Sequence, residues 1–197
     1  EETGIHAAIE SELDGLDVDD VADLQHRGER IRRTISEASM PSQLESAILE
    51  QYAELGDELG IDDPEVAVRS SATAEDLPQA SFAGQQETFL NVAGETALIK
   101  PIKHCFASLF TDRAIAYREN NDFDHFDVKL ACTVQKMGRA DLASSGVLFT
   151  LDPDTGFEKV VTIEAAYGFG EPIVQGVVDP DRYVVFKPTT GIVEKER

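Results

Sequence analysis

A single arginine stands at the end of a short apolar run, directly before small and hydroxyl residues. The run Val66–Val68 leads into Arg69, and the polar stretch that follows contains Gly84 and, four residues later, Thr88. Arginine presents a planar fork of N–H donors that matches phosphate oxygens. Small residues let backbone N–H groups approach phosphates closely, and hydroxyls add further donors. The segment therefore indicates a polyphosphate site, although a surface ion pair beside an ordinary Ser/Gly loop also explains these residues.

A second candidate site lies where a predicted strand ends at Gln135 and runs into Met137. An amide side chain both donates and accepts hydrogen bonds, and the edge of adenine offers a matching donor and acceptors. Gln135 and free backbone N–H and C=O groups near Met137 are therefore candidate contacts to the base, with Met137 packed on the ring. The alternative is a plain strand end with a buried, gap-filling methionine.

Three long segments resemble, in order, the phosphoenolpyruvate synthase and pyruvate phosphate dikinase family. They are VAVRSSATAEDLPQASFAGQQETFLN (66–91), VQKMGRADLASSGVLFTLDPDTGF (134–157) and IEAAYGFGEPIVQGVVDPDRYVV (163–185). The similarity covers most of the chain after residue 60, and three blocks in family order are far more specific than one glycine motif. The wording from Ala140 to Phe157 is closest to the phosphoenolpyruvate synthase branch. A fragment similar to rifampin phosphotransferase and a non-catalytic nucleotide-binding module remain the alternatives.

The resemblance implies an α/β (α+β) fold that is ATP-grasp-like and partial, with an N-terminal helical segment. Residues 1–60 are expected to form the helical part, and residues 61–126 a lobe with a phosphate-binding loop. Residues 127–197 are then expected to form a strand-rich lobe that carries the adenine hinge and is incomplete by itself.

The resemblance also implies nucleotide-binding roles for six residues: Arg69, Gly84, Thr88, Phe89, Gln135 and Met137. Arg69 would in addition be catalytic, because a fixed cation stabilises charge on a phosphoryl group in transfer. Gly84 and Thr88 would lie in a loop over the triphosphate with Phe89 beside it, and Ser81 and Gln85 are neighbours in that loop. Glu164 lies at the end of an apolar run. Two roles are expected for it equally: contact with a ribose or a cation, or an ion pair at the rim of the core.

ATP and Mg²⁺ are the ligands that the resemblance implies, with the metal ligands expected outside this chain. The four histidines show no metal-ligand spacing. The implied parent enzyme converts ATP, pyruvate and water to AMP, phosphoenolpyruvate and phosphate through a phosphohistidine. Its phosphohistidine domain and pyruvate-binding barrel are the expected partners, and we expect this chain to be an excised part of it, inactive alone because phosphoryl transfer needs positioning and metal together.

Charge and composition restrict the binding partners and the cellular compartment that can be expected for this chain. The 197 residues include 38 acidic and 17 basic ones, for a net charge of −21. Such a charge repels phosphates, so nucleic acid and anionic membrane are not expected partners. It is typical either of a salt-rich cytosol or of an ordinary acidic protein. The absence of an 18-residue apolar run and of a signal peptide predicts a cytoplasmic protein. Cys105 and Cys132 are expected to be buried free thiols rather than a disulfide or redox pair.

Periodicity predicts helices first and strands later. Two amphipathic helices are expected within residues 1–60, the second with Ser39 as its N-cap, Pro41 in its first turn and Gly60 just beyond its end. A further helical stretch spans residues 94–119, where Pro101 is expected to split or kink it because proline lacks an N–H.

Strands are predicted at residues 66–71 and 88–92, and again at 146–150, 160–166 and 182–187. Between them, strict alternation predicts one more strand after His125. In that strand one face carries Val128, Leu130, Cys132 and Val134, and the other carries Lys129, Ala131, Thr133 and Gln135. Residues 168–171 are expected to form a turn with positive φ angles.

Overall fold

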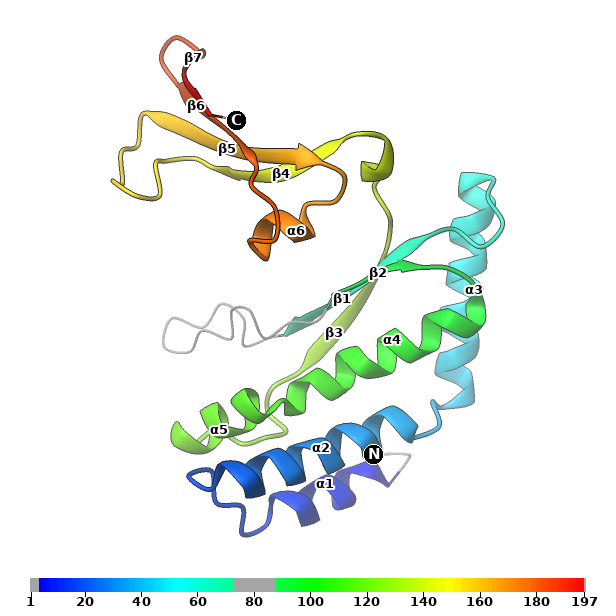
Figure 1. The fold of residues 1–197 in the computed structure, drawn as a ribbon. Helices are drawn as coiled ribbons and strands as arrows, with labels where there is room; N and C mark the ends of the chain where they lie inside the picture. Colours follow the sequence, from blue (N-terminus) through cyan, green and yellow to red (C-terminus); the bar gives the residue numbers. More distant parts are fainter. Residues whose placement is uncertain (1–3, 73–87, 197) are drawn as a thin grey trace. The chain divides into compact units, whose positions relative to one another are not determined.

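The computed structural model describes residues 4–72 and 88–196. The chain divides into two compact units on either side of the Met137–Gly138 bond, which we call unit 1 and unit 2. Figure 1 shows their elements in sequence colours. Each unit has its own antiparallel sheet, so the mixed helix-and-strand class predicted from the sequence is confirmed.

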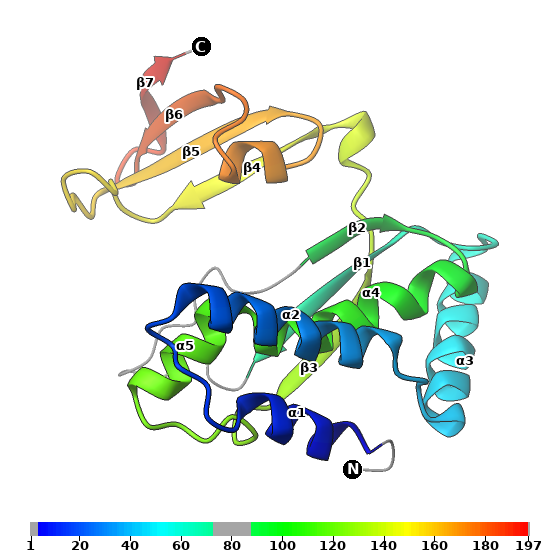
Figure 2. The same ribbon diagram turned by 60° about the horizontal axis from the view of Figure 1, so that its bottom comes forward.

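Unit 1 is a sheet covered on one face by stacked helices. Its strands β1 (Val66–Ala72), β2 (Thr88–Val92) and β3 (Leu130–Lys136) pair in the order β2-β1-β3. Its helices are α1 (Ile5–Leu13), α2 (Val21–Glu37), α3 (Ser42–Leu59), α4 (Glu95–Ala107) and α5 (Asp112–Asn120), with a 3₁₀ turn η1 (Ser108–Phe110). Figures 1 and 2 show α4 against one face of the sheet, with α2 on the far side of α4.

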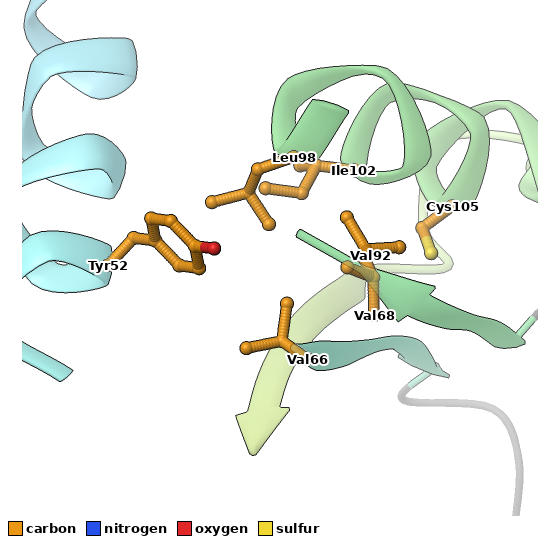
Figure 3. Close-up of a cluster of buried hydrophobic side chains, with 7 residues drawn as sticks. All are labelled: Tyr52, Val66, Val68, Val92, Leu98, Ile102 and Cys105. Carbon is orange, nitrogen blue, oxygen red and sulfur yellow. The ribbon is translucent and has the colours of Figure 1, made fainter. Parts of the chain in front are cut away.

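The main core of unit 1 lies between this covered face and helices α3 and α4. Figure 3 shows apolar side chains from both layers directed toward one another. The buried members are Tyr52 from α3, Val66 and Val68 from β1, Val92 from β2, and Leu98, Ile102 and Cys105 from α4. Removing such side chains from water is the main stabilising contribution to a fold of this kind.

One hydroxyl ties this core to two loops. The buried Tyr52 donates its O–H to the Pro64 carbonyl at 2.9 Å and accepts from the Gly94 N–H at 2.8 Å. Pro64 lies just before β1, and Gly94 lies between β2 and α4. A residue of α3 therefore fixes the point where the central strand begins and the point where the chain leaves β2.

A second buried polar group orders the chain after α5. Arg118 is 0% exposed. It donates to the Leu109 carbonyl at 2.5 Å and to Nδ1 of His125 at 3.0 Å, and it lies over the Phe110 ring. Burial lowers the pKa of Arg118 to about 10, so it is still charged at neutral pH. Because Nδ1 of His125 accepts, Nε2 donates to Glu119, 2.6 Å away. His125 is thus a packing residue, which agrees with the lack of metal-ligand spacing among the histidines.

Unit 2 is a four-stranded sheet in chain order. It consists of β4 (Ser144–Phe149), β5 (Val160–Tyr167), β6 (Asp181–Phe186) and β7 (Gly191–Glu196), with the short helices η2 (Ala140–Leu142) and α6 (Glu171–Val174). The Lys187 ammonium donates to the carbonyls of Thr150 and Glu158, which closes the connection from β4 to β5. Gly168, with φ of 90°, makes the predicted turn before α6.

Several local predictions are confirmed. The strand at 88–92 is β2 itself, and those starting at 66 and 160 match β1 and β5 to within a residue. Gly60 ends α3 in the left-handed region with φ of 62°, and Cys105 and Cys132 are both free. In the part of the chain that the structure describes, every helix is too short or too polar to cross a bilayer.

Other local predictions are wrong. Pro41, not Ser39, is the residue before α3. Of the split or kink expected at Pro101, the split is wrong, because Pro101 lies inside a continuous α4. The break comes at η1, where Thr111 caps α5 by accepting from the Ala114 N–H. Leu98, Ile102 and Cys105 are buried on both sides of the proline, and this packing keeps the helix continuous despite the lost hydrogen bond.

The division of the chain also differs from the expected one. We expected residues 127–197 to form one strand-rich lobe. In the structure β3 pairs along its whole length with β1, from Val66 opposite Lys136 to Ala72 opposite Leu130. The third strand of unit 1 therefore comes from the C-terminal side of that expected boundary, because its pairing partner lies about sixty residues earlier in the chain.

The Tyr52 bridge gives the first prediction. Tyr52→Phe keeps the ring and leaves the Pro64 carbonyl and the Gly94 N–H without their partner, so unfolding should become easier by about 1–3 kcal/mol. Tyr167→Phe is the matched control, because Tyr167 is 95% exposed and should change stability by less than about 0.5 kcal/mol. Urea unfolding of the three proteins measures both; equal stability for Tyr52→Phe and the parent chain contradicts the bridge.

Candidate functional site

The two faces of β1 have opposite character. Val66, Val68 and Ser70 are buried toward the helices. The other face, which we call the open face, carries the exposed Arg69 and Ser71 and, before them, the small buried residue Ala67. β3 follows the same rule, since Thr133 and Gln135 are exposed and the residues between them are half-buried. Period-two alternation on paired strands thus places a set of polar side chains on one surface.

Register places two hydroxyls beside Arg69 on the open face. In the β1–β2 ladder Arg69 lies opposite Thr88, and in the β1–β3 ladder it lies opposite Thr133. Directly opposed residues share a face and have Cβ atoms about 5 Å apart. Two positions further along the ladder, and therefore on the same face, Gln135 lies opposite Ala67. Arginine, two threonines and an amide therefore form one continuous polar patch.

The charge of Arg69 is not neutralised by the described part of unit 1. Several other arginines of unit 1 are paired, such as Arg27 with Asp23 at 2.8 Å and Arg32 with Asp112 at 2.6 Å. Within residues 4–72 and 88–196, Arg69 has no carboxylate within ion-pair distance, and its side chain is exposed. A fixed guanidinium flanked by hydroxyls on a rigid strand is suited to bind an anion with several oxygens.

A bulge in β2 determines which residue faces Arg69. Val66 pairs with Val92, and Val68 pairs with Phe89, so two residues of β2 stand opposite one of β1. Asn91 is one of the two residues in the bulge, and its φ of 57° lies in the left-handed region that asparagine tolerates. With regular pairing Phe89 would lie opposite Arg69. The bulge instead brings Thr88 to that position.

Phe89 consequently lies on the covered face. It packs against the main core and makes an edge-to-face contact with His104 of α4, with ring centroids 5.9 Å apart. The structure therefore separates Phe89 from Arg69, Thr88 and Gln135, although all four were predicted to contact the nucleotide. Gly84, with its neighbours Ser81 and Gln85, lies outside the described residues.

Met137 follows β3 and is buried. Its N–H donates to the Glu65 carbonyl at 2.9 Å, which extends the ladder one residue past the strand. The Met137 N–H is therefore not available to a base, because the sheet already uses that donor. Gln135, whose amide is exposed on the open face, keeps its side-chain donors and acceptor toward solvent.

Thr133 is the residue that the sequence reasoning did not single out. Its signal was present, since the alternation placed it on one face with Gln135. Only the register of β3 against β1 shows that it stands next to Arg69. The local sequence pattern predicts on which face of a strand a side chain lies, but it does not predict which residue of the neighbouring strand pairs with it.

Glu164 lies in unit 2, on β5, half-buried and opposite Arg182 of β6. The ion pairs of Arg182 go to Asp154 at 3.6 Å and Asp152 at 3.9 Å. Asp152 is itself held in a turn, where the hydrogen bond from Thr155 and then the Asp154 N–H lower the pKa of its carboxyl. Glu164 therefore stands beside a small charged cluster.

Comparison with known families agrees with a nucleotide site. The family model for the pyruvate phosphate dikinase AMP/ATP-binding domain matches residues 1–197, and the chain belongs to this family. The membership predicted from the three sequence blocks is confirmed.

The relatives it resembles carry one name. The chain is 56% identical over 189 residues to the phosphoenolpyruvate synthase of Aquifex aeolicus, covering 93% of this chain and 22% of the relative. It is 52% identical to that of Synechocystis sp. and 51% to that of Escherichia coli, covering 96% of this chain and 24% of the relative in each case. The chain thus spans about a quarter of the length of these relatives.

The bulge gives the second prediction. Asn91→Val should destabilise unit 1 by roughly 1–2 kcal/mol, because a β-branched residue is disfavoured at positive φ. Asn91→Gly should keep stability within about 0.5 kcal/mol, since glycine adopts this conformation freely. Urea unfolding followed by near-ultraviolet circular dichroism measures the difference, and equal stability of the two variants contradicts the left-handed bulge.

Proposed function

We infer that this chain is the ATP-binding, ATP-grasp-like part of a phosphoenolpyruvate synthase. The observation that carries the proposal is the row Thr88–Arg69–Thr133 on the open face of unit 1, in a chain of the AMP/ATP-binding family. This row offers to an anion two hydroxyls and a cation that has no ion-pair partner among the described residues. The chain carries a net charge of −21, so such a local cation is what allows it to hold a polyphosphate.

In this proposal Arg69 binds the phosphates of ATP, and Thr88 and Thr133 donate hydroxyl hydrogen bonds to their oxygens. Gly84 and its neighbours supply backbone N–H groups from the loop between β1 and β2. Phe89 acts from behind the sheet: its packing against His104 holds β2 in the bulged register that presents Thr88.

In the same proposal the Gln135 side chain recognises adenine by hydrogen bonds. It lies on the open face two residues along β3 from Thr133, about 7 Å away along the strand. Its amide matches the donor and acceptor edge of adenine. Met137 contributes apolar contact and its carbonyl, because its N–H is engaged with Glu65.

The activity of the longer enzyme is part of the proposal. ATP, pyruvate and water would yield AMP, phosphoenolpyruvate and phosphate, with the phosphoryl group carried by a histidine on another domain. Arg69 would stabilise the charge on the phosphoryl group in transfer. In the described part of this chain no group of three or more Asp, Glu, His or Cys side chains is placed to hold a metal, and the metal ligands of the proposed enzyme are assigned to its other parts. No step is therefore assigned to a metal here.

Arg69 is the residue whose replacement tests the proposal. In the full-length enzyme Arg69→Ala should lower turnover by on the order of 10²–10³, the usual effect of removing one charge-stabilising donor. Arg69→Lys should recover only part of that loss, because an ammonium lacks the planar fork. Steady-state kinetics of pyruvate-dependent ATP consumption measures both variants.

Arg33→Ala is the matched control for this test. Arg33 is an exposed arginine on α2, on the helical side of unit 1, and its removal should leave turnover unchanged. Thermal melts of the parent enzyme and the three variants show whether a loss of turnover is caused by unfolding. Normal turnover in folded Arg69→Ala protein would refute the phosphate-site assignment.

Gln135 gives a test of the base-reading role. Gln135→Ala should weaken ATP binding by about 1–2 kcal/mol, the cost of a lost hydrogen bond with an unsatisfied partner. The preference for ATP over GTP should narrow at the same time. Calorimetric titration with both nucleotides measures this, with Gln51→Ala on the exposed side of α3 as the control. Unchanged affinity and base preference would place the adenine site elsewhere.

A further inference from the structure

The two cysteines of the chain meet in the core of unit 1, on the side of the sheet away from the open face. Cys132 is on β3, where it pairs with Ser70 of β1, and Cys105 is on α4. Both pack in the main core, and the Cys105 side chain is hydrogen-bonded to that of Cys132. Packing brings them together, since η1 and α5 lie between them in the sequence.

The two thiols differ in access. Cys105 is 0% exposed, whereas Cys132 is half-buried. Cys132 lines a groove of about 480 Å³ between α3 and the sheet, whose walls are mainly apolar. The wall residues include Ile48, Leu55, Leu98 and Val134. A small molecule entering this groove reaches Cys132 first and meets Cys105 only behind it.

The surroundings of Cys132 favour the thiolate form of its side chain. They also favour reaction with a neutral reagent over an anionic one. The hydrogen bond from Cys105 lowers the pKa of the Cys132 thiol, against the opposing effect of burial. A thiolate is the nucleophilic form of cysteine. Glu54 and Glu58 also line the groove, and both are exposed carboxylates. Their charge repels anionic reagents and leaves small neutral oxidants unhindered.

We propose that Cys132 and Cys105 form an oxidant-responsive thiol pair, in which a hydroperoxide oxidises Cys132 and Cys105 resolves the product as a disulfide. In the first step the Cys132 thiolate attacks one oxygen of hydrogen peroxide. The O–O bond breaks, Cys132 becomes a sulfenic acid and hydroxide leaves. In the second step the Cys105 sulfur attacks the Cys132 sulfur, the S–O bond breaks, and the proton of the Cys105 thiol leaves with the oxygen as water. Two thiols are oxidised and one peroxide is reduced to two waters.

The product fits the packing of unit 1. A disulfide would join α4 to β3 within the existing core, where the two side chains are already hydrogen-bonded to each other. Cys132 is followed by Thr133 on the opposite face, so the cross-link lies directly behind the candidate site. The proposal does not depend on what binds the open face.

The test uses the folded, reduced chain treated with hydrogen peroxide. We expect both free thiols to be lost together in the monomer, and peptide mapping to recover Cys105 linked to Cys132. Dithiothreitol should restore both thiols. Retention of both thiols under conditions that oxidise an unfolded sample of the same chain overturns the proposal, as does accumulation of sulfinic acid on Cys132 with no disulfide.

Two serine variants separate the roles. In Cys105→Ser the reaction should stop at a Cys132 sulfenic acid that dimedone traps. In Cys132→Ser the buried Cys105 should stay reduced in the folded protein. Neutral 2,2′-dithiodipyridine should react with Cys132 faster than the dianionic Ellman reagent does. Oxidation of Cys105 in Cys132→Ser at the parent rate would show that the groove does not select Cys132 and would overturn the assignment. Circular dichroism confirms that each variant is folded.

Discussion

Within the described residues of unit 1, helices cover one face of the sheet, and this asymmetry determines where its polar side chains lie. Alternation sends Val66, Val68 and Ser70 into the core and leaves Arg69 outside. Had helices covered both faces, Arg69 would need a buried counter-charge, because an unpaired buried charge is very costly. On the open face its charge is available to an incoming anion. The core and the candidate site are thus two consequences of one strand's periodicity.

Two local devices maintain this arrangement. The Tyr52 hydroxyl anchors the chain before β1 and after β2, so the ends of the sheet are held by α3. The bulge at Asn91 shifts β2 by one residue and exchanges Phe89 for Thr88 beside Arg69. Neither device touches the anion that we propose, yet both decide which side chains it meets. Bulges often have this role near functional sites.

The sequence predicted the parts of the structure that depend on local pattern. Alternation placed Thr133 and Gln135 on one face, and β2 was predicted residue for residue. Pairing partners were not predictable in this way, so β3 was assigned to the wrong side of the expected lobe boundary. Pro101 failed as a helix breaker because buried neighbours on both sides outweigh one lost hydrogen bond. Arg69 was found through its place at a strand end, whereas Thr133 needed the register.

The buried Tyr52 also gives unit 1 an optical property. The chain has no tryptophan and four tyrosines, so its near-ultraviolet absorption and emission arise mainly from tyrosine. Tyr52 is held in a fixed, asymmetric environment, while Tyr167 in unit 2 is almost fully in solvent. The near-ultraviolet dichroism of the folded chain should therefore be weighted toward rings such as Tyr52, and its loss on unfolding reports packing rather than helix content. Tyr52, which anchors the ends of the sheet, thereby also serves as an intrinsic spectroscopic probe of whether unit 1 is folded.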